Sequence, residues 1–478
     1  MRLLFKRNVF DNKKIMIMFD KKVKFLPFLV VVCAIPLYFY FNKKTEQVIT
    51  QPDKWIMINN SEANMLNYKN GKLFYEDVDL NSIAKRYGTP VYVYSKAKIV
   101  DNCEGYNKAF QEHGFKNYKV HFAMKANSNL SVLKLALKHG LGIDAVSVGE
   151  IKKARFAGFA YKDIVFSGVG KSEDDLKFSV KKGIGQINIE SFEEIEMLME
   201  VANRLKKTAN VAIRINPDIK AHTHEKISTG GKKNKFGIDA KKLDEAIALI
   251  KTCKYLNFNG LSIHIGSQLT KLEDFEKAFS FVANIYKDHP EFKTVDLGGG
   301  LGINYNNGEI ISKSEYVGLI AKYFSDFNGK IMIEPGRSII GDASVFLTKI
   351  VRIKRTDAAN FIIVDGGMNN LVRPAMYGAW HQPMLTKNNI DTTGEVEKYD
   401  IVGPICESGD IFAKDVLLNK ITDEDNYVAF LYAGAYGKSM ASGYNLHDIA
   451  RELMVDGKRV IEISKPIRWE DLVKFEMA

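Results

Sequence analysis

The feature that most constrains the fold is a regular alternation of short β-rich runs with amphipathic helical stretches between residues 90 and 336. Helix-like segments such as residues 191–205 and 242–253 carry apolar residues at every third or fourth position, which is typical of an α-helix with one buried face. Strands that alternate with helices usually pair in parallel. The pattern therefore predicts a parallel β/α domain over residues 90–340.

Eight strands are predicted in this region, and a (β/α)8 TIM-like barrel is the simplest way to assemble them. An open, doubly wound sheet is the alternative, because periodicity does not report whether a sheet closes. The predicted strands are Tyr118–Met124, Gly142–Val146, Asp163–Ser167, Gln186–Ile189, Val211–Ile215, Leu261–Ile265, Thr294–Leu297 and Ile331–Glu334.

Beyond Gly336 the strand-like runs follow one another without helical spacers, as in residues 344–356, 360–367 and 426–436. This spacing is typical of antiparallel strands. Residues 341–478 are therefore predicted to form a second, mostly antiparallel C-terminal β domain. Residues 56–89, with the strand-like segment 71–80, are expected to join it.

The first 55 residues form a basic and apolar extension. They hold eleven Lys and Arg against four acidic residues, which accounts for seven of the eleven net positive charges. No basic cluster with interleaved aromatic residues follows, so nucleic-acid binding is not expected. Residues 25–41 are uncharged, approach the length of a membrane span and follow eight Lys and Arg. They are interpreted either as a membrane anchor or signal-like segment, or as a stretch upstream of a later start at Met57 or Met65.

Two further patterns bear on location and on metals. The four cysteines are widely spaced and form no C-x-x-C pair, which favours a reduced, cytoplasmic protein that contacts a membrane only if residues 25–41 insert. His222 and His224 form an H-x-H pair, but no third ligand lies at a suitable spacing. No metal is predicted.

Polar residues fall where the predicted barrel strands end. In a β/α barrel the functional residues stand at the carboxyl ends of the strands, and phosphate groups are typically held after strands seven and eight. The residues at these strand ends are Lys125, Asp144, Arg214, His264, Ser267, Gly298–Gly300, Glu334 and Arg337.

A lysine, a glycine run and a carboxylate at one barrel mouth suit pyridoxal phosphate. Glycines let backbone N–H groups approach a phosphate, and a desolvated lysine near cations has a lowered pKa and forms a Schiff base with an aldehyde. Glu334 would keep the pyridine nitrogen protonated, and His264 would lie flat against the ring. Each residue also has an ordinary structural reading, as a solvated strand end, a salt-bridged rim acid or a core histidine. Their combination favours the cofactor site.

From about residue 68 onward the chain resembles the fold type III pyridoxal-phosphate-dependent decarboxylases, and most closely the diaminopimelate decarboxylase family. The matching stretches occur in the family's order and cover roughly four-fifths of the chain, which is more specific than any single motif. They are "FAMKAN", "GIDAVSVGE", "HIGSQ", "DLGGGLGI", "EPGR", "VDGGMNNLVRPAMYGAWH", "GPICESGD" and "AGAYGKSMAS".

The resemblance implies roles for individual residues. Lys125 would carry pyridoxal 5'-phosphate, and Cys406 would donate a proton after decarboxylation. Arg337, Arg373 and Tyr377 would hold the distal carboxylate of the substrate, and Glu407 its distal ammonium. Tyr436 would touch both cofactor and substrate. The implied cofactor contacts are Lys125, His264, Ser267, Gly299, Gly300, Glu334, Pro335, Gly336, Arg337 and Tyr436.

The implied activity is decarboxylation of meso-2,6-diaminopimelate to L-lysine and CO2, the last step of bacterial lysine biosynthesis. The implied assembly is a homodimer that shares its active sites through Cys406 and Glu407. Two alternatives stay open. A decarboxylase of ornithine or arginine would have no use for Arg373, because its substrate has no distal carboxylate. A catalytically inactive binding protein would be expected to lose Lys125 or the glycine run, and both are present.

Overall fold

The computed structural model describes residues 65–219, 234–305, 308, 310–387, 396–421, 426–474 and 476. The candidate membrane segment 25–41 and the H-x-H pair at 222–224 lie outside these residues. Among the helices that are described, none is long and apolar enough to cross a bilayer.

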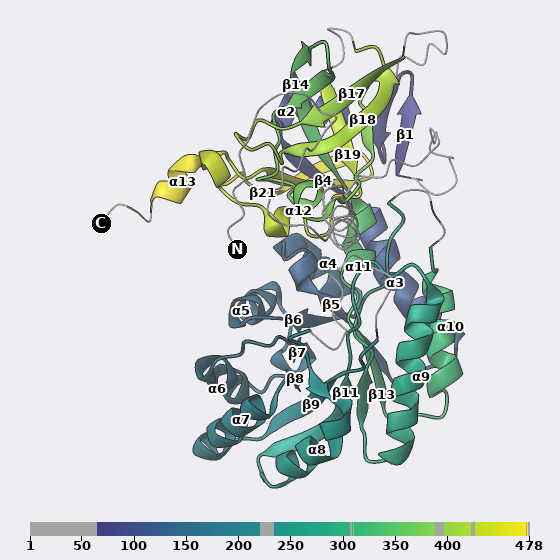
Figure 1. Cartoon of the computed structure of the whole chain (residues 1–478), viewed down its shortest axis with the longest axis vertical. Coiled ribbons are helices and arrows are strands. Elements are labelled where there is room, and N and C mark those ends of the chain that lie inside the picture. The colour runs from purple at the N-terminus through teal and green to yellow at the C-terminus, as the bar shows by residue number, and fades with distance from the viewer. Residues whose placement is uncertain are drawn as a thin grey trace, which may run out of the picture. The chain divides into compact units, whose positions relative to one another are not determined.

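Eight parallel strands form a closed barrel, drawn in the lower half of Figure 1. The last strand pairs with the first through Ile331 opposite Tyr118, and Ile187 opposite Val211 continues the circle. This closure confirms the barrel and excludes the open sheet. The strands are β5 (Tyr118–Ala123), β6 (Gly142–Ala145), β7 (Ile164–Phe166), β8 (Gln186–Ile189), β9 (Ala209–Asn216), β11 (Leu256–Ser262), β12 (Thr294–Asp296) and β13 (Lys330–Ile333).

Helices surround the barrel and return the chain from one strand to the next. The predicted helices 191–205 and 242–253 correspond to α7 and α8. Serine side chains begin several helices: Ser172 and Ser312 each form a capping box with the acidic residue three positions later, which satisfies backbone N–H groups of the first turn. The helices are α3 (Lys96–Glu112), α4 (Leu130–Lys138), α5 (Val148–Ala157), α6 (Glu173–Lys182), α7 (Phe192–Leu205), α8 (Leu243–Lys251), α9 (Leu272–Asp288) and α10 (Lys313–Phe324).

A second, mostly antiparallel sheet lies above the barrel in Figure 1. Its long central strand, β14, pairs antiparallel with three neighbours, whereas β4 with β20 and β15 with β17 run parallel. The strands are β4 (Val91–Ser95), β14 (Ser344–Arg355), β15 (Asn360–Val364), β16 (Pro383–Leu385), β17 (Val396–Val402), β18 (Ile411–Asn419), β19 (Tyr427–Leu431), β20 (Arg451–Asp456) and β21 (Arg459–Ser464).

One strand differs from the expected domain boundary. β4 lies within the range 90–340 expected for the barrel, but it pairs with β14 and β20 of the second sheet. A β-rich run followed by the helix α3 has the local pattern of a barrel unit. Only pairing over more than 200 residues distinguishes the two positions, and local periodicity carries no information about it.

The amino-terminal strands form a small sheet of their own, β1 (Leu66–Lys69), β2 (Lys72–Tyr75) and β3 (Val78–Asp79), followed by α2 (Leu80–Tyr87). Leu73 and Ile83 share a buried apolar cluster with Val345 and Ala429 of the large sheet. Segment 71–80 thus contributes strands that pack against the β domain without entering its sheet.

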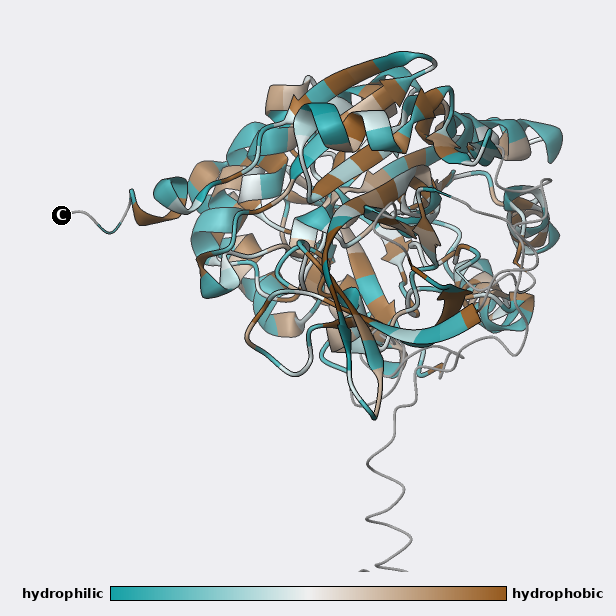
Figure 2. Cartoon of the chain, turned by 90° about the horizontal axis from the view of Figure 1, so that it is seen from above, coloured by the Kyte–Doolittle hydropathy of each residue, from teal (hydrophilic) through white to brown (hydrophobic). Residues whose placement is uncertain are grey.

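Hydropathy follows this arrangement. Figure 2 shows teal, hydrophilic residues along the outer faces of the helices and brown, hydrophobic residues along the strands. The barrel strands contribute fully buried residues such as Phe122, Ile143 and Leu261 to the main core. A rigid, close-packed scaffold of this kind fixes the side chains at its rim.

Candidate active site

Most of the site residues predicted on the barrel lie at the carboxyl ends of its strands. Lys125 stands in the 3-10 turn Met124–Ala126 directly after β5, and Asp144 lies on β6. His264 follows β11, and Glu334 follows β13. Because all eight strands are parallel, these positions meet at one rim. The same rim faces the second sheet.

Lys125 is held by an acid. Its Nζ lies 2.7 Å from Asp144 Oδ2, and the Asp144 side chain is fully buried while that of Lys125 is 37% exposed. Burial by itself lowers the pKa of Lys125, but the charges of Asp144, Tyr436 and Glu334 together outweigh it and raise the pKa above its ordinary value. The expectation of a lysine near cations with a lowered pKa is therefore wrong for this structure, because a carboxylate faces the amine.

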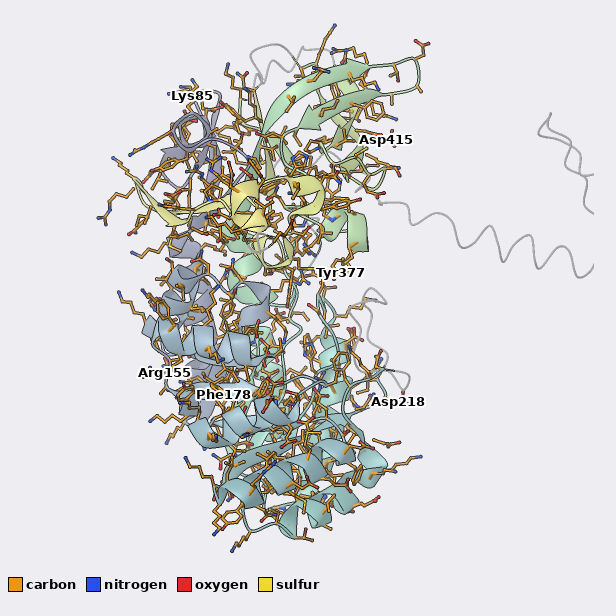
Figure 3. The ribbon with its side chains drawn as sticks, turned by 90° about the vertical axis from the view of Figure 1, so that its left-hand side faces the viewer. Lys85, Arg155, Phe178, Asp218, Tyr377 and Asp415 are labelled. Atoms are coloured by element: carbon orange, nitrogen blue, oxygen red, sulfur yellow. The ribbon has the colours of Figure 1, made fainter. Side chains whose placement is uncertain are left out.

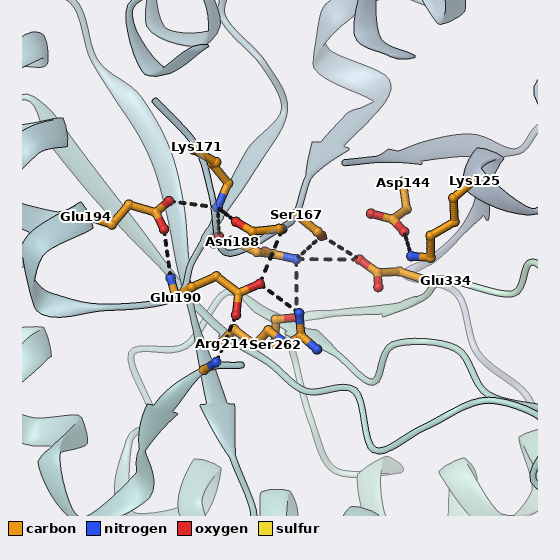
Figure 4. Close-up of polar contacts among 12 residues, drawn as sticks. Lys125, Asp144, Ser167, Lys171, Asn188, Glu190, Glu194, Arg214, Ser262 and Glu334 are labelled. Carbon is orange, nitrogen blue, oxygen red and sulfur yellow. Dashed lines mark hydrogen bonds and ion pairs between the residues drawn. The ribbon is translucent and has the colours of Figure 1, made fainter. Parts of the chain in front are cut away.

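Glu334 lies in a buried polar network beside this pair (Figure 4). Its Oε1 accepts from Ser167 Oγ and Asn188 Nδ2, each at 3.5 Å. Burial raises the pKa of Glu334 well above its ordinary value, and the nearby carboxylates of Asp144 and Asp296 raise it further. Burial also raises the pKa of Asp296 to about 6. Each of these two buried carboxyl groups therefore favours its protonated form more than an ordinary carboxyl group does.

Two further ion pairs lie at the same rim, and Figure 4 shows them with the Lys125–Asp144 pair. Lys171 Nζ lies 2.7 Å from Glu194 Oε1, and Arg214 Nη1 lies 2.7 Å from Glu190 Oε1, with all four side chains buried. The guanidinium of Arg214 also stacks on the Phe236 ring, 4.6 Å from its centroid. Paired and buried in this way, these residues hold Arg214 at the end of β9.

His264 lies against the glycine run. The Gly299 N–H donates to His264 Nδ1 at 3.2 Å, so the imidazole carries its proton on Nε2. Burial lowers the pKa of His264 well below its usual value, and the charges of Arg214 and Lys125 lower it further. The imidazole is thus neutral. Its ring is fixed by a backbone group of the run itself.

The glycine run is required by close backbone contacts. A Cβ on Gly299 would lie 2.3 Å from the Glu334 carbonyl oxygen, and Gly300 has a φ of +118°. Two of the three N–H groups bind side chains, that of Gly298 to Asp296 and that of Gly299 to His264. The N–H of Gly300 has no such side-chain contact among the described residues, and the predicted contacts of Gly299 and Gly300 with a cofactor stay predictions.

Two arginines meet where the barrel faces the β domain. Arg337 follows the barrel, and Arg373 begins the short helix α12 (Arg373–Tyr377) of the β domain. Each is 5% exposed. Arg337 Nη1 and Arg373 Nη1 donate to the same atom, Tyr305 Oη, at 2.8 and 3.0 Å. Arg337 Nη2 also donates to Ser267 Oγ at 3.2 Å, so this guanidinium links both sides of the site.

Two tyrosines border this pair. The Arg337 guanidinium lies 4.9 Å from the Tyr436 ring centroid, and the Tyr436 N–H donates to the Ala126 carbonyl beside Lys125. Tyr377 ends α12, and in Figure 3 it lies at the level where barrel and β domain meet. The structure thus brings Tyr436 to the lysine and the arginines.

Cys406 and Glu407 lie elsewhere on the chain. Both are exposed, in the loop between β17 and β18. The Cys406 N–H donates to Asn445 Oδ1, and Glu407 Oε1 accepts from the Gly409 N–H. These contacts do not join the group around Lys125.

Comparison with known proteins gives the same family from sequence and from structure. The family described as pyridoxal-dependent decarboxylase, pyridoxal binding domain, matches residues 96–341. A diaminopimelate decarboxylase of Zymomonas mobilis is 42% identical over 85% of this chain and 97% of its own length.

Solved structures agree with this match. The diaminopimelate decarboxylase of Helicobacter pylori complexed with L-lysine is 37% identical, with a TM-score of 0.78, covering 83% of this chain and 99% of that one. The diaminopimelate decarboxylase of M. jannaschii in complex with L-lysine is 34% identical, with a TM-score of 0.81, covering 87% and 98%. The chain belongs to the diaminopimelate decarboxylase family.

The cofactor of this family, pyridoxal 5'-phosphate, fits the side chains that the rim presents. Six buried side-chain polar atoms have no hydrogen-bond partner among the described residues, and three of the six belong to residues of this site: Asp144 Oδ1, Asp296 Oδ2 and Arg337 Nε. A buried polar atom without a partner is costly, so these atoms point to a ligand with matching groups. Lys125 would hold the aldehyde end, Ser267 and Gly300 the phosphate, and Glu334 the ring nitrogen.

Three residues of this decarboxylase site were missed by sequence reasoning. Tyr305 joins the two arginines, Asp296 is a buried carboxyl with a raised pKa near Glu334, and His381 Nε2 lies 2.8 Å from Arg373 Nη1. Asp296 precedes the glycine run, and its position at a strand end was the available signal. Tyr305 and His381 carry no such signal, since one lies on a loop and the other in the β domain.

The ion pair of Lys125 with Asp144 gives a pH prediction. In Asp144→Asn the opposing charge is lost while burial remains, so the pKa of Lys125 falls. Cofactor binding, followed by its absorbance against pH, should then begin at lower pH than in the wild type. Asp101→Asn, a change on the exposed face of α3, is the control. An unshifted midpoint in Asp144→Asn would show that Asp144 does not set the state of the amine.

Proposed function

We propose that the chain decarboxylates meso-2,6-diaminopimelate at the barrel rim and releases L-lysine and CO2. The observation that carries this proposal is the pair of buried arginines that meet at Tyr305, where the barrel faces the β domain. Two guanidinium groups facing one point suit a carboxylate. A substrate that is held by a second carboxylate, far from the reacting carbon, needs such a pair. Ornithine and arginine do not.

When bound, pyridoxal phosphate supplies a ring that accepts the electron pair left by loss of CO2. The chain's own residues prepare the site for this chemistry. Glu334, whose raised pKa favours its protonated form, would hold a proton for the ring nitrogen of the cofactor. His264, neutral and fixed by Gly299, presents an uncharged face beside Lys125. The arginines fix the far end of the substrate and so orient the scissile bond.

Lys125 and Cys406 are the proposed proton carriers. The amine of Lys125 is charged when Asp144 faces it, so it can return a proton as substrate leaves. Cys406 is a free, exposed thiol, and a thiol carries an S–H proton that it can donate. It is proposed to protonate the α-carbon, with Glu407 beside it holding the distal ammonium.

The exposure of Cys406 and Glu407 supports a homodimer in which this loop completes the site of a second copy. The exposed apolar side chain of Leu446 follows Asn445, which accepts a hydrogen bond from the Cys406 N–H. Sedimentation of the active protein should give a particle of two chains. A fully active monomer would contradict this assembly.

A cytoplasmic location is proposed as well, supported by free, unpaired cysteines at Cys103 and Cys253.

Product identity tests the proposed reaction. The purified protein, with added pyridoxal phosphate, is incubated separately with meso-diaminopimelate, ornithine and arginine. Equal amounts of CO2 and L-lysine are expected from diaminopimelate alone. Putrescine or agmatine as the main product would overturn the proposed substrate, and cofactor binding without any product would favour a binding protein.

Arg373 tests the recognition of the distal carboxylate. In Arg373→Met, loss of one partner of a buried charged contact should raise the KM for diaminopimelate at least about thirty-fold, the low end of the range for such truncations. Arg373→Lys should recover little, since a point charge does not reproduce the fork. Arg355→Met, which breaks an exposed ion pair on β14, is the control. An unchanged KM in Arg373→Met would mean that the carboxylate binds elsewhere.

A further inference from the structure

Tyr305 is the residue through which the two arginines are joined. It lies on the loop after β12, beyond the glycine run. Its phenol oxygen is the only described atom to which the structure assigns hydrogen bonds from both guanidinium groups, at 2.8 and 3.0 Å. Both guanidinium groups also lie over its ring, with the Arg373 carbon 4.9 Å and the Arg337 carbon 5.8 Å from the ring centroid.

The arrangement has an electrostatic cost that Tyr305 offsets. Arg337 and Arg373 are both nearly buried, and their like charges repel. His381 adds a third basic group, and its Nε2 lies 2.8 Å from Arg373 Nη1. Burial and both arginines lower the pKa of His381 well below its usual value, so it stays neutral and can accept that hydrogen bond. The phenol oxygen of Tyr305 accepts a hydrogen bond from each of the two cations and so places a group of opposite polarity between them.

The charges around Tyr305 act on its ionisation. Burial by itself raises the pKa of Tyr305, and Asp342 raises it slightly more, but Arg337 and Arg373 outweigh both and hold the pKa below its ordinary value. The rings of His381 and Tyr432 pack edge-on against Tyr305 at centroid distances of 5.5 and 6.0 Å. The phenol is thus confined by neutral rings and polarised by two cations.

We propose that Tyr305 is a specificity-determining, positioning residue that holds Arg337 and Arg373 together as one carboxylate-binding fork. It does so through one oxygen that accepts from both, so that neither guanidinium has to move when the distal carboxylate arrives. This inference rests on the proposed function, because the fork is useful only for a substrate with that carboxylate.

Steady-state kinetics of Tyr305→Phe tests the inference. The ring and its packing remain, and only the shared oxygen is lost. Without it the guanidinium groups separate, so the KM for diaminopimelate should rise about ten-fold or more while kcat changes little, since hydrogen bonds to charged groups are lost on the binding side alone. A lower KM would overturn the inference, because it would show that the phenol competes with the substrate for the arginines. An unchanged KM would overturn it as well.

The matched control is Tyr68→Phe. Tyr68 is a partly buried tyrosine of the amino-terminal sheet, and its hydroxyl donates to the Leu385 carbonyl at 2.6 Å. This variant also loses one tyrosine hydroxyl, but it should keep the wild-type KM. A rise in KM of equal size in both variants would indicate a general loss of packing and would count against a role for the Tyr305 oxygen.

A spectroscopic measurement decides the point without turnover. The near-ultraviolet absorbance of ionised tyrosine is titrated in wild-type holoenzyme and in Tyr305→Phe, and the difference isolates Tyr305. One tyrosine should ionise below the ordinary pKa of about 10, and the step should be missing from the variant. Identical titrations would overturn the inference even if the variant were too unstable for kinetics. If the wild type shows this step but does not act on diaminopimelate, the proposed substrate fails while the link between Tyr305 and the arginines stands.

Discussion

Lys125→Ala is expected to lower kcat by at least roughly a thousandfold, within the range measured for positioned groups that transfer protons. The amine stands at the end of β5 beside Asp144, and among the described residues no other lysine contacts that carboxylate. Its loss removes both the anchor for the cofactor and a proton carrier. Turnover of diaminopimelate, measured as CO2 release at saturating substrate and cofactor, checks the prediction.

The control for this change is Lys153→Ala. Lys153 lies on the neighbouring helix α5, and its Nζ bonds Ser128 Oγ at 3.1 Å on the exposed side. That variant should keep its activity within about two-fold, as is usual for surface substitutions. Retained turnover in Lys125→Ala would exclude the amine from the chemistry, whatever the fold of the variant.

Glu334→Gln should give the second large effect, a fall in kcat of roughly a hundredfold or more. The amide keeps the shape of the side chain and its contact with Ser167, but it cannot exchange a proton with Asp296 or with a ring nitrogen. Cofactor binding should change much less than kcat. The measurement is therefore kcat at saturating cofactor, together with the cofactor affinity from absorbance.

Glu452→Gln is the matched control for Glu334. Glu452 is a carboxyl of similar burial, 3% exposed against 7% for Glu334, that bonds Tyr94 on β4 and Asn129 at the start of α4. It lies outside the proposed machinery, so its kcat should stay within about ten-fold. If the Glu334 variant lost cofactor affinity and kept its kcat, the carboxyl would serve binding, and its proposed role in proton handling would be wrong.

Much of the fold could be predicted from the sequence because the barrel repeats a local pattern. Each strand is followed by a helix whose apolar period is visible within a dozen residues, and all eight predicted strands overlap strands of the structure. β4 could not be placed in this way. Its partners are decided by pairing with Glu452 and Phe346, which are more than 200 residues away.

The site, too, has features that could be predicted from the sequence and features that could not. Lys125, His264, Glu334 and the glycine run could be predicted as one cluster, because parallel strands deliver their carboxyl ends to one rim. The pKa of Lys125 could not be predicted, because it depends on the distance to Asp144 and on burial. Tyr305 could not be predicted either. A tyrosine on a loop acquires its role only when the barrel and the β domain place two arginines on either side of it.

The account depends on the amine of Lys125 meeting the cofactor at the top of the barrel. Borohydride reduction of the cofactor-loaded protein fixes the cofactor to the amine that carries it, and mass spectrometry of the digested protein then locates the added mass. The account predicts one labelled site, on the peptide that contains Lys125. Labelling of a different lysine, or an unlabelled protein that still decarboxylates, would contradict it.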